Sequence, residues 1–545
     1  MSMRSTRALF VLLASALPIL AIGGEAPAPG IDPVRLQAHV EFLASDLLEG
    51  RAAGSRGYDI AARYVASQLQ QLGAKPAGDE GTWYQTVPLL EAAPVIPAGK
   101  VKLERGGKTV EMVNSEDFLP RAFFAAPAST VTAPLVYVGH AIHAPELGYD
   151  DFAGVDLKGR IAVSLSGAPP KFPNTSRAHY SHTSTKLQAL VERGAVGWLF
   201  IYTPVDEKSV PWDRSLLHSW MPSMRWTDGN GVPFEAFEQV KVRVHLSRAG
   251  AQKLFAGAPL TVEQAFANSD AGRAKSFALP GTATVEVKST IGRTTSTNVV
   301  GSIEGSDPKL RHEYVVFTAH LDHVGRGAPV KGDAIYNGAM DNATGIAIML
   351  EMARYFASLE RRPRRSLVFL AVTAEEKGLL GADYYARQPT VPRSAIVANI
   401  NVDMPVALTE LADLVAFGAE HSSLGAIAER ATRAEGMTLI PDPMPEEVVF
   451  VRSDQYAFVK QGIPALYMDV GSKSRTPGVD GQKVMLGFLR EHYHMPSDDT
   501  TQPINYPSLA ALGRVNARIG LEVADADARP HWNKGDFFGE RFAKK

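Results

Sequence analysis

The segment from about Thr284 to Ala524 alternates short apolar runs with helical patterns, and this alternation constrains the fold more than any other feature of the sequence. The runs VVFTAH, SLVFLAV and AIVANINV have the length of buried strands, and GIAIMLEMARYFASL between the first two repeats its apolar residues at helical spacing. Strands that alternate with helices form parallel sheets whose faces the helices cover. We therefore predict an α/β fold with a mostly parallel central sheet flanked by helices.

The rest of the chain predicts further parts around this α/β region. Residues 32–73 contain two helical patterns, VRLQAHVEFLASDLL and YDIAARYVASQLQQLG. Later, short β-branched runs such as TVTAPLVYVG, GRIAVSLSG and AVGWLFIYT dominate. We assign residues 27–125 to the N-terminal part of the α/β domain, 126–275 to an inserted β-rich domain, 284–524 to the domain that carries the chemistry, and 525–545 to a C-terminal tail.

The first 26 residues predict a secretory signal peptide. Arg4 and Arg7 precede an apolar segment of signal-peptide length, and small residues follow it. A membrane anchor is the alternative, but the apolar run from Ala8 to about Gly23 is short for a span of roughly 20 residues. We expect a periplasmic or secreted protein with no stable membrane association after the signal is removed.

Charge and cysteine content exclude several classes of function. The 545 residues include 56 Lys and Arg against 58 Asp and Glu, so the net charge of −2 gives no field that would attract nucleic acid. The chain contains no cysteine, which excludes thiolate nucleophiles and disulfides. Any metal must therefore be held by histidine and carboxylate side chains.

Several such side chains follow the carboxyl ends of predicted strands, where open α/β sheets bind their ligands. Others lie in the Gly-rich turn NGAMDNATG and in the segment HYHMPSDD. Each residue alone has an ordinary explanation, such as a helix cap or a solvated charge. Together they indicate a site for hard to borderline divalent metals. The set consists of His320, Asp322, Asp341, Glu375, Glu376, Asp403 and His494.

The local spacings suggest how these residues divide the work. Residues two apart in a strand face the same way, so the Asp322 carboxylate is expected to accept the second ring N–H of His320 and fix its tautomer. Adjacent residues point apart, so one of Glu375 and Glu376 is expected to be a ligand and the other to address a bound water. The two oxygens of Asp341 can bridge two metals.

The motifs HLDHVG, MDNATG, TAEEKGLLG, NVD and YHMPSDD, in this order, resemble the co-catalytic di-zinc aminopeptidases, relatives of leucyl aminopeptidase and glutamate carboxypeptidase. The β-rich segment, with DLKGRIAVSLSG, is similar to the protease-associated domain of many family members. The resemblance implies two zinc ions per chain, or manganese or cobalt in their place. It assigns His320 and Asp403 to one ion, Glu376 and His494 to the other, and Asp341 to both.

The resemblance also implies that Glu375 is the general base. With Asp322, which the strand spacing places behind His320, it makes up the expected catalytic residues. Two positions depart from the family pattern: Gln455 replaces a histidine in RSDQYAFVKQGIP, and Phe450 stands where some members carry a tyrosine that assists the oxyanion. The group that polarises the intermediate beyond the metals is left open. His492 competes with His494 as a ligand, although the YH-x-P pattern favours His494.

The sequence therefore predicts a metallo-exopeptidase that cleaves peptides through a metal-bridged hydroxide, with an aminopeptidase as the leading hypothesis. A carboxypeptidase or dipeptidase is the alternative on the same scaffold, since Arg452 could pair with a substrate carboxylate. From another class, the chain could be a non-catalytic binding or scaffold protein. The preferred side chain, the native metal, the role of the inserted domain and the oligomeric state are left open.

Overall fold

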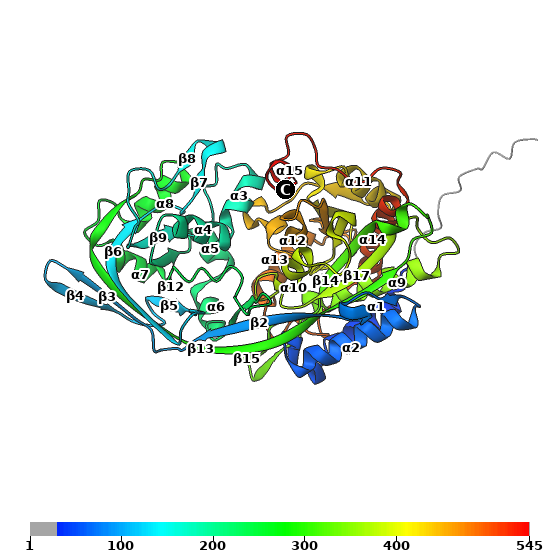
Figure 1. Cartoon of the computed structure of the whole chain (residues 1–545), viewed down its shortest axis with the longest axis horizontal. Coiled ribbons are helices and arrows are strands. Elements are labelled where there is room, and N and C mark those ends of the chain that lie inside the picture. The colour runs from blue at the N-terminus through cyan, green and yellow to red at the C-terminus, as the bar shows by residue number, and fades with distance from the viewer. Residues whose placement is uncertain (1–29, 544–545) are drawn as a thin grey trace, which may run out of the picture.

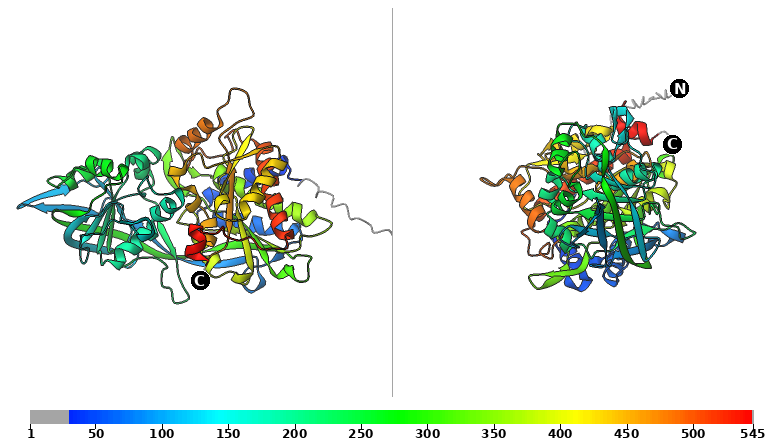
Figure 2. Two further views of the ribbon diagram at one scale, coloured as in Figure 1. Left: turned by 90° about the horizontal axis from the view of Figure 1, so that it is seen from above. Right: turned by 90° about the vertical axis from the view of Figure 1, so that its left-hand side faces the viewer.

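The computed structural model of the protein describes residues 30–543, so the predicted signal peptide lies outside the described residues. Two parts lie side by side along the longest axis of the molecule (Figure 1). One part, here called the central domain, is built on the predicted α/β sheet. The other, here called the β-rich unit, has its own sheet and its own apolar cores. A view from above shows the same side-by-side arrangement (Figure 2).

The four strands at the middle of the central sheet are parallel, which confirms the predicted α/β class. They pair in the order β17, β14, β18 and β21. The sheet continues through β13, β2 and β11 on one side, where each pairing is antiparallel. On the other side β19 pairs antiparallel to β21 and parallel to β20. The bounds are β17 (Ser366–Val372), β14 (Tyr314–His320), β18 (Ile396–Asn401), β21 (Ala465–Val470), β13 (Phe277–Ile303), β2 (Tyr84–Pro94), β11 (Ser223–Trp226), β19 (Asp413–Phe417), β20 (Thr438–Ile440) and the short β1 (Lys75–Pro76), which pairs with β13.

Helices bury both faces of this sheet, which explains why its central strands are mostly apolar; Thr318, Asn399 and Asn401 are buried polar exceptions. Along β14, Val315 and Phe317 pack into one core and Val316 packs into the other. The first core is covered by α1 (Pro33–Leu43), α2 (Arg56–Gln71), α9 (Thr344–Ser358), α11 (Leu424–Ala434), α13 (Gly481–Glu491) and α14 (Tyr506–Asp525). The second is covered by α10 (Leu380–Arg387), α12 (Gln455–Val459) and α15 (Phe537–Phe542).

The β-rich unit contains a mixed sheet with the strand order β4, β3, β13, β6, β9, β10, β12 and β5. Its strands are β3 (Lys100–Arg105), β4 (Lys108–Met112), β5 (Phe118–Arg121), β6 (Ala128–Tyr137), β9 (Ile161–Leu165), β10 (Gly197–Ile201) and β12 (Val242–Leu246). Its helices are α3 (Asn174–Ser181), α4 (Thr183–Glu192), α5 (Pro204–Ser209), α6 (Trp212–Leu217), α7 (Arg248–Phe255) and α8 (Val262–Asp270). Two small hairpins complete the described strands: β7 (His143–Ala144) with β8 (Tyr149–Asp150), and β15 (Gly325–Val330) with β16 (Asp333–Tyr336). The likeness of this unit to a protease-associated domain stays a prediction.

The predicted boundary at residue 126 is wrong, because β3, β4 and β5 precede it and pair within the β-rich sheet. In the other direction, β11 lies inside the predicted insert but pairs with β2 of the central sheet. One long strand, β13, belongs to both sheets: residues 277–288 pair with β6, and residues 289–299 pair with β2. Figure 1 shows β13 running beneath both parts. Composition could not reveal this, because the strand changes sheets without a break.

Residues 525–543 form an ordered part of the central domain rather than a loose tail. Helix α15 places Phe538, which is fully buried, against His421, Phe450 and Tyr456. Within residues 30–543, no helix combines the length and apolar character needed to cross a membrane.

Candidate metal centre

The predicted site residues meet at the carboxyl edge of the central sheet. His320 is the last residue of β14 and lies opposite Val372, the last residue of β17. Glu375 and Glu376 follow β17 by three and four residues, and Asp403 follows β18 by two. Parallel strands end at the same edge, so the fold brings these side chains together. Asp341 reaches them from the turn before α9, and His494 from the segment after α13.

The first group of candidate ligands joins three buried residues. His320 Nε2 lies 2.9 Å from Asp403 Oδ1 and 3.1 Å from Asp341 Oδ1. The other oxygen of Asp403 accepts a hydrogen bond from Ser453 Oγ at 2.5 Å, which fixes the orientation of the carboxylate.

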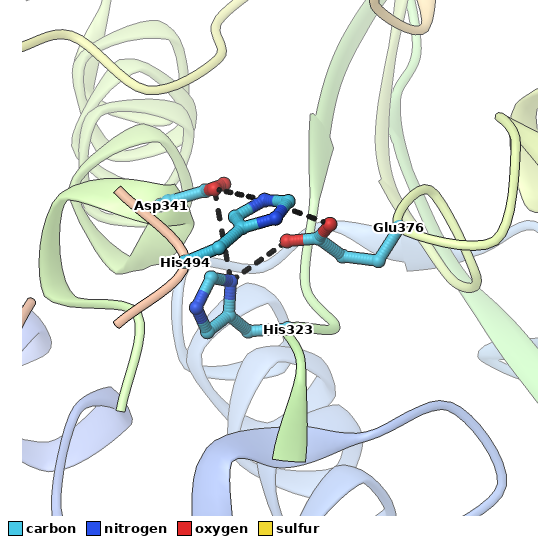
Figure 3. A group of neighbouring side chains, drawn as sticks. All are labelled: His323, Asp341, Glu376 and His494. Atoms are coloured by element: carbon cyan, nitrogen blue, oxygen red, sulfur yellow. Dashed lines mark ion pairs between the residues drawn. The ribbon is translucent and has the colours of Figure 1, made fainter. Parts of the chain in front are cut away.

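The second group joins four residues from four separate segments (Figure 3). His494 Nε2 lies 3.0 Å from Glu376 Oε2 and 3.2 Å from Asp341 Oδ2, and His323 Nδ1 lies 2.8 Å from Glu376 Oε1. In each group the candidate ligand atoms all lie within 4.8 Å of one another. Asp341 is the member that the groups share, through a different oxygen in each. The pattern is that of a bridging carboxylate.

His323 is the site residue that sequence reasoning missed. It lies three residues after His320 in HLDHVG, and its side chain is fully buried. His323 Nδ1 and Glu376 Oε1 are only 2.8 Å apart, yet neither atom has a hydrogen-bond partner among residues 30–543. Two electron-rich atoms this close without hydrogen-bond geometry point toward one common position, as ligands of a cation do. The nitrogen and oxygen donors of both groups fit zinc.

We expect replacement of His323 by alanine to weaken binding of one metal ion at least tenfold to a hundredfold, by analogy with the loss of residues that support metal sites. Equilibrium dialysis against zinc, read by elemental analysis, measures this without reference to activity. His492→Ala is the matched control, because the His492 ring bonds to Ser497 Oγ and belongs to neither ligand group. Equal zinc binding by both variants would show that His323 is a packing residue.

The expected role of the Asp322 side chain is wrong. The ring of His320 does bond to Asp322, but through the main-chain carbonyl, with Nδ1 3.0 Å from the oxygen. The carboxylate instead accepts the main-chain N–H groups of Glu375 at 3.0 Å and Glu376 at 3.4 Å. Strand β14 ends at His320, so the rule that residues two apart share a face does not extend to Asp322. The residue still serves the site, because it positions the two glutamates.

The two adjacent glutamates have opposite electrostatic environments. Burial raises the pKa of Glu375 well above its ordinary value, and the charges of Asp403 and Glu376 add to this. Burial acts on Glu376 in the same direction, but His494 and His323 hold its pKa well below its ordinary value. A metal ligand must be ionised, which suits Glu376, and a general base must exchange a proton, which suits Glu375. These are the roles that the resemblance implied.

Strained backbone marks the turns that aim these side chains. Ala374, directly before Glu375, has φ +53°, and Met404, directly after Asp403, has φ +37°. His494 itself has φ +55°. Such conformations cost roughly 1–3 kcal/mol each in residues other than glycine and gather at functional sites. The surrounding structure therefore holds the ligands in a geometry that the free chain would avoid.

A buried arginine from the EGRAAGS segment holds the loops of the site. Arg51 donates to the carbonyls of Leu321 at 2.9 Å, Asn337 at 2.6 Å and Gly338 at 3.0 Å, and also to that of Leu43. Burial lowers its pKa to about 10, although neighbouring carboxylates oppose this. The N-terminal helices are thereby tied to the loops before and after β15 and β16.

We expect Arg51→Met to lower the free energy of unfolding by at least about 3 kcal/mol, because each buried carbonyl left without a donor costs about 1–3 kcal/mol. Urea denaturation measures the change. Arg56→Met is the control, since Arg56 is exposed. A loss no larger than that of the control would mean that water replaces the guanidinium.

The departures from the family pattern have structural roles here. Gln455 is fully buried, donates to the carbonyl of Phe450 at 2.7 Å and accepts from Asn401 at 3.0 Å. The Phe450 ring packs 4.9 Å from His421, in an apolar cluster away from the ligands. Near the ligands, the Tyr493 ring lies 3.9 Å from that of His494. The β-rich unit also reaches the site, because His218 Nε2 lies 3.0 Å from the carbonyl oxygen of His494.

The fold and this donor set define an α/β protein with a paired histidine–carboxylate metal centre at the carboxyl edge of a parallel sheet. Residues 298–519, less than half of the chain, match the model of Peptidase family M28. The match confirms the resemblance to co-catalytic zinc peptidases that the motifs indicated.

Curated relatives resemble this chain over short segments. A probable zinc metalloprotease of Pyrenophora teres f. teres (strain 0-1) is 38% identical over 110 residues, which are 20% of this chain and 22% of that protein. Aminopeptidase NAALADL1 of Mus musculus is 33% identical over 127 residues, 22% of this chain and 15% of that protein. The matched segments thus span less than a quarter of each relative.

Among solved structures, the aminopeptidase from Aneurinibacillus sp. strain AM-1 is similar over 92% of this chain and 95% of its own. The TM-score is 0.53 at 21% sequence identity. This likeness supports the α/β fold of the described chain.

Proposed function

We propose that the protein is an exported di-zinc aminopeptidase that hydrolyses N-terminal residues from peptides. The observation that carries this proposal is the position of Asp341, which joins two separate groups of candidate ligands through its two oxygens. One residue shared in this way supports two ions side by side rather than one. His320 and Asp403 would hold the first ion, and His323, Glu376 and His494 the second.

When bound, two divalent cations lower the pKa of a water molecule and polarise a peptide carbonyl. The remaining chemistry belongs to Glu375, which lies beside both groups but is a member of neither. Its carboxylate takes the proton of the attacking water and returns it to the leaving amine. Asp322 keeps this carboxylate in place through the main-chain N–H of Glu375.

The preference for the amino end of a peptide is supported by the names of two similar proteins, both of which are called aminopeptidases. A carboxypeptidase or dipeptidase needs a cation that is free to bind the substrate carboxylate. Arg452, the candidate for that role, already lies 3.2 Å from Glu447 Oε2. This pairing favours the aminopeptidase over the alternative.

Export rests on the sequence of residues 1–26, where Arg4 and Arg7 precede the apolar run. Fractionation of cells that express the full chain tests it. We expect the processed protein in the periplasm or the medium, and a protein of unprocessed mass in the cytoplasm would contradict export.

Chromogenic aminoacyl substrates, compared with N-blocked peptides of the same sequence, test the specificity of the full chain. We expect hydrolysis of the free-amine substrates only, with activity lost on chelation and restored by zinc. Cleavage of N-blocked peptides from the carboxyl end would support the carboxypeptidase. A protein that binds no zinc and cleaves neither substrate would support the scaffold hypothesis.

A further inference from the structure

A cavity of about 270 Å³ lies where the β-rich unit meets the central domain, away from the metal centre. Arg121 of β5, Arg243 of β12 and Lys186 of α4 reach it from the β-rich unit, and Arg225 reaches it from β11 of the central sheet. Within the described chain, the lining residues include no carboxylate. Hydroxyl groups and the aromatic side chains Trp198, Phe200 and Tyr202 complete the lining.

The positive charges of these arginines repel one another. Arg121 and Arg243 lie directly opposite each other in the antiparallel β5–β12 ladder. Like charges at such positions destabilise a sheet. Burial, together with the charges of Arg225 and Arg121, lowers the pKa of Arg243 to about 9. An arrangement of this kind is stabilised when an anion lies between the guanidinium groups.

Most donors of these arginines are left for a ligand. Arg243 donates to the carbonyl of Ala122 at 3.2 Å, and Arg225 donates to the carbonyls of Glu235 at 3.1 Å and Met224 at 2.7 Å. These partners are neutral main-chain groups. Within residues 30–543, the side chain of Arg121 makes no hydrogen bond or ion pair, and its guanidinium carbon lies 5.7 Å from the centre of the Phe200 ring.

Glu235 acts on Arg225 from outside the lining, and the two carboxylates that act on Lys186 already accept hydrogen bonds. Asp206 accepts from Ser166 Oγ at 2.6 Å and from Thr203 Oγ at 2.5 Å. Asp151 accepts from the main-chain N–H of His140 at 2.8 Å and from Tyr149 Oη at 2.7 Å. Both contribute to the potential at the buried Lys186, but neither lines the cavity.

Helix α4 adds donors of a different kind. Its first residue, Thr183, lines the cavity, and the residue before it, His182, provides no side-chain cap for the first turn. The positive end of a ten-residue helix with open N–H groups therefore faces the same space as the arginines.

We propose that this cavity binds a multiply charged oxyanion, a phosphate or a compact polycarboxylate, between Arg121, Arg225 and Arg243. The volume suits a small anion with its bound water rather than a peptide. Because Arg225 belongs to the central sheet and the other two arginines to the β-rich sheet, the bound anion ties the two parts together. This site is independent of the proposed peptidase activity.

Thermal unfolding of the full chain in sodium phosphate, sodium citrate and sodium chloride at equal ionic strength tests the proposal. We expect phosphate, citrate or both to raise the Tm above its value in chloride, and calorimetric titration of the same anions to give the dissociation constants. The anion that raises the Tm shows whether the cavity prefers a phosphate or a polycarboxylate. No shift beyond that of chloride with either anion would overturn the proposal.

Two variants assign the effect to the cavity. Arg121→Gln and Arg243→Gln are expected to weaken binding of the effective anion at least tenfold. Arg273→Gln, an exposed arginine of the β-rich unit that does not line the cavity, is expected to bind it as the parent does. The side chain of Arg121 makes no hydrogen bond or ion pair within the described fold. In chloride, the Arg121→Gln variant is therefore expected to have the same Tm as the parent or a higher one. Unchanged anion affinity in both cavity variants would overturn the proposal.

Discussion

The Glu375→Gln variant is expected to turn over peptide substrates about 10² to 10⁴ times more slowly than the parent while keeping its metal ions. Loss of a general base costs a rate factor of this size. Glu375 belongs to neither ligand group, and its main-chain N–H, which the substitution preserves, anchors the turn to Asp322. The amide cannot accept a proton, but it has nearly the shape of the carboxylate. The measurement is kcat with a chromogenic aminoacyl substrate, together with elemental analysis for zinc.

Glu360→Gln is the matched control, because Glu360 is exposed in the loop after α9. It is expected to keep parental kcat and zinc content. Turnover of the Glu375 variant within a few-fold of the control would remove this residue as the base. Loss of zinc from the Glu375 variant would instead make it a ligand.

The Asp341→Ala variant is expected to lose both metal ions and nearly all activity. Asp341 is the residue that the two ligand groups have in common, so its removal weakens both at once. Asp403→Ala, by comparison, removes a member of the first group only and is expected to leave one ion bound. Elemental analysis after dialysis is expected to give about two ions in the parent, one in the Asp403 variant and none in the Asp341 variant.

We expect the metal-free Asp341 variant to stay folded, because removing one of several neighbouring carboxylates relieves their mutual repulsion. Circular dichroism melting of the metal-free proteins checks this point. Equal metal content in the Asp341 and Asp403 variants would contradict the bridging role and indicate two independent sites.

The architecture of the central domain followed from hydrophobic patterning. Segments predicted as strands, such as the run ending at His320, became β14, β17 and β18, because strands buried on both faces are mostly apolar. The position of the ligands followed from the same patterning, since parallel strands end at one edge. The structure brings His320, Asp341, Glu376, Asp403 and His494 together there.

The features that escaped prediction depend on geometry beyond the ends of regular elements. His323 lies past the end of β14, where the alternation of faces gives no guide to direction. The same limit misplaced the carboxylate of Asp322, whose main-chain carbonyl took the expected role. Arg51 donates to four main-chain carbonyls. Every residue carries a carbonyl, so the sequence does not indicate these partners. The boundary near residue 126 failed because a continuous strand has no linker.

The shared strand β13 has a mechanical consequence for whatever enters the site. Its pairing with β6 ends at Lys288 and its pairing with β2 begins at Ser289, so no unpaired linker residue separates the two sheets along this strand. His218 of the β-rich unit lies beside His494. Because paired strands connect the unit to the central sheet, we expect the position of His218 to be fixed. If the chain is the peptidase proposed above, its substrates would meet His218 at a fixed position beside His494.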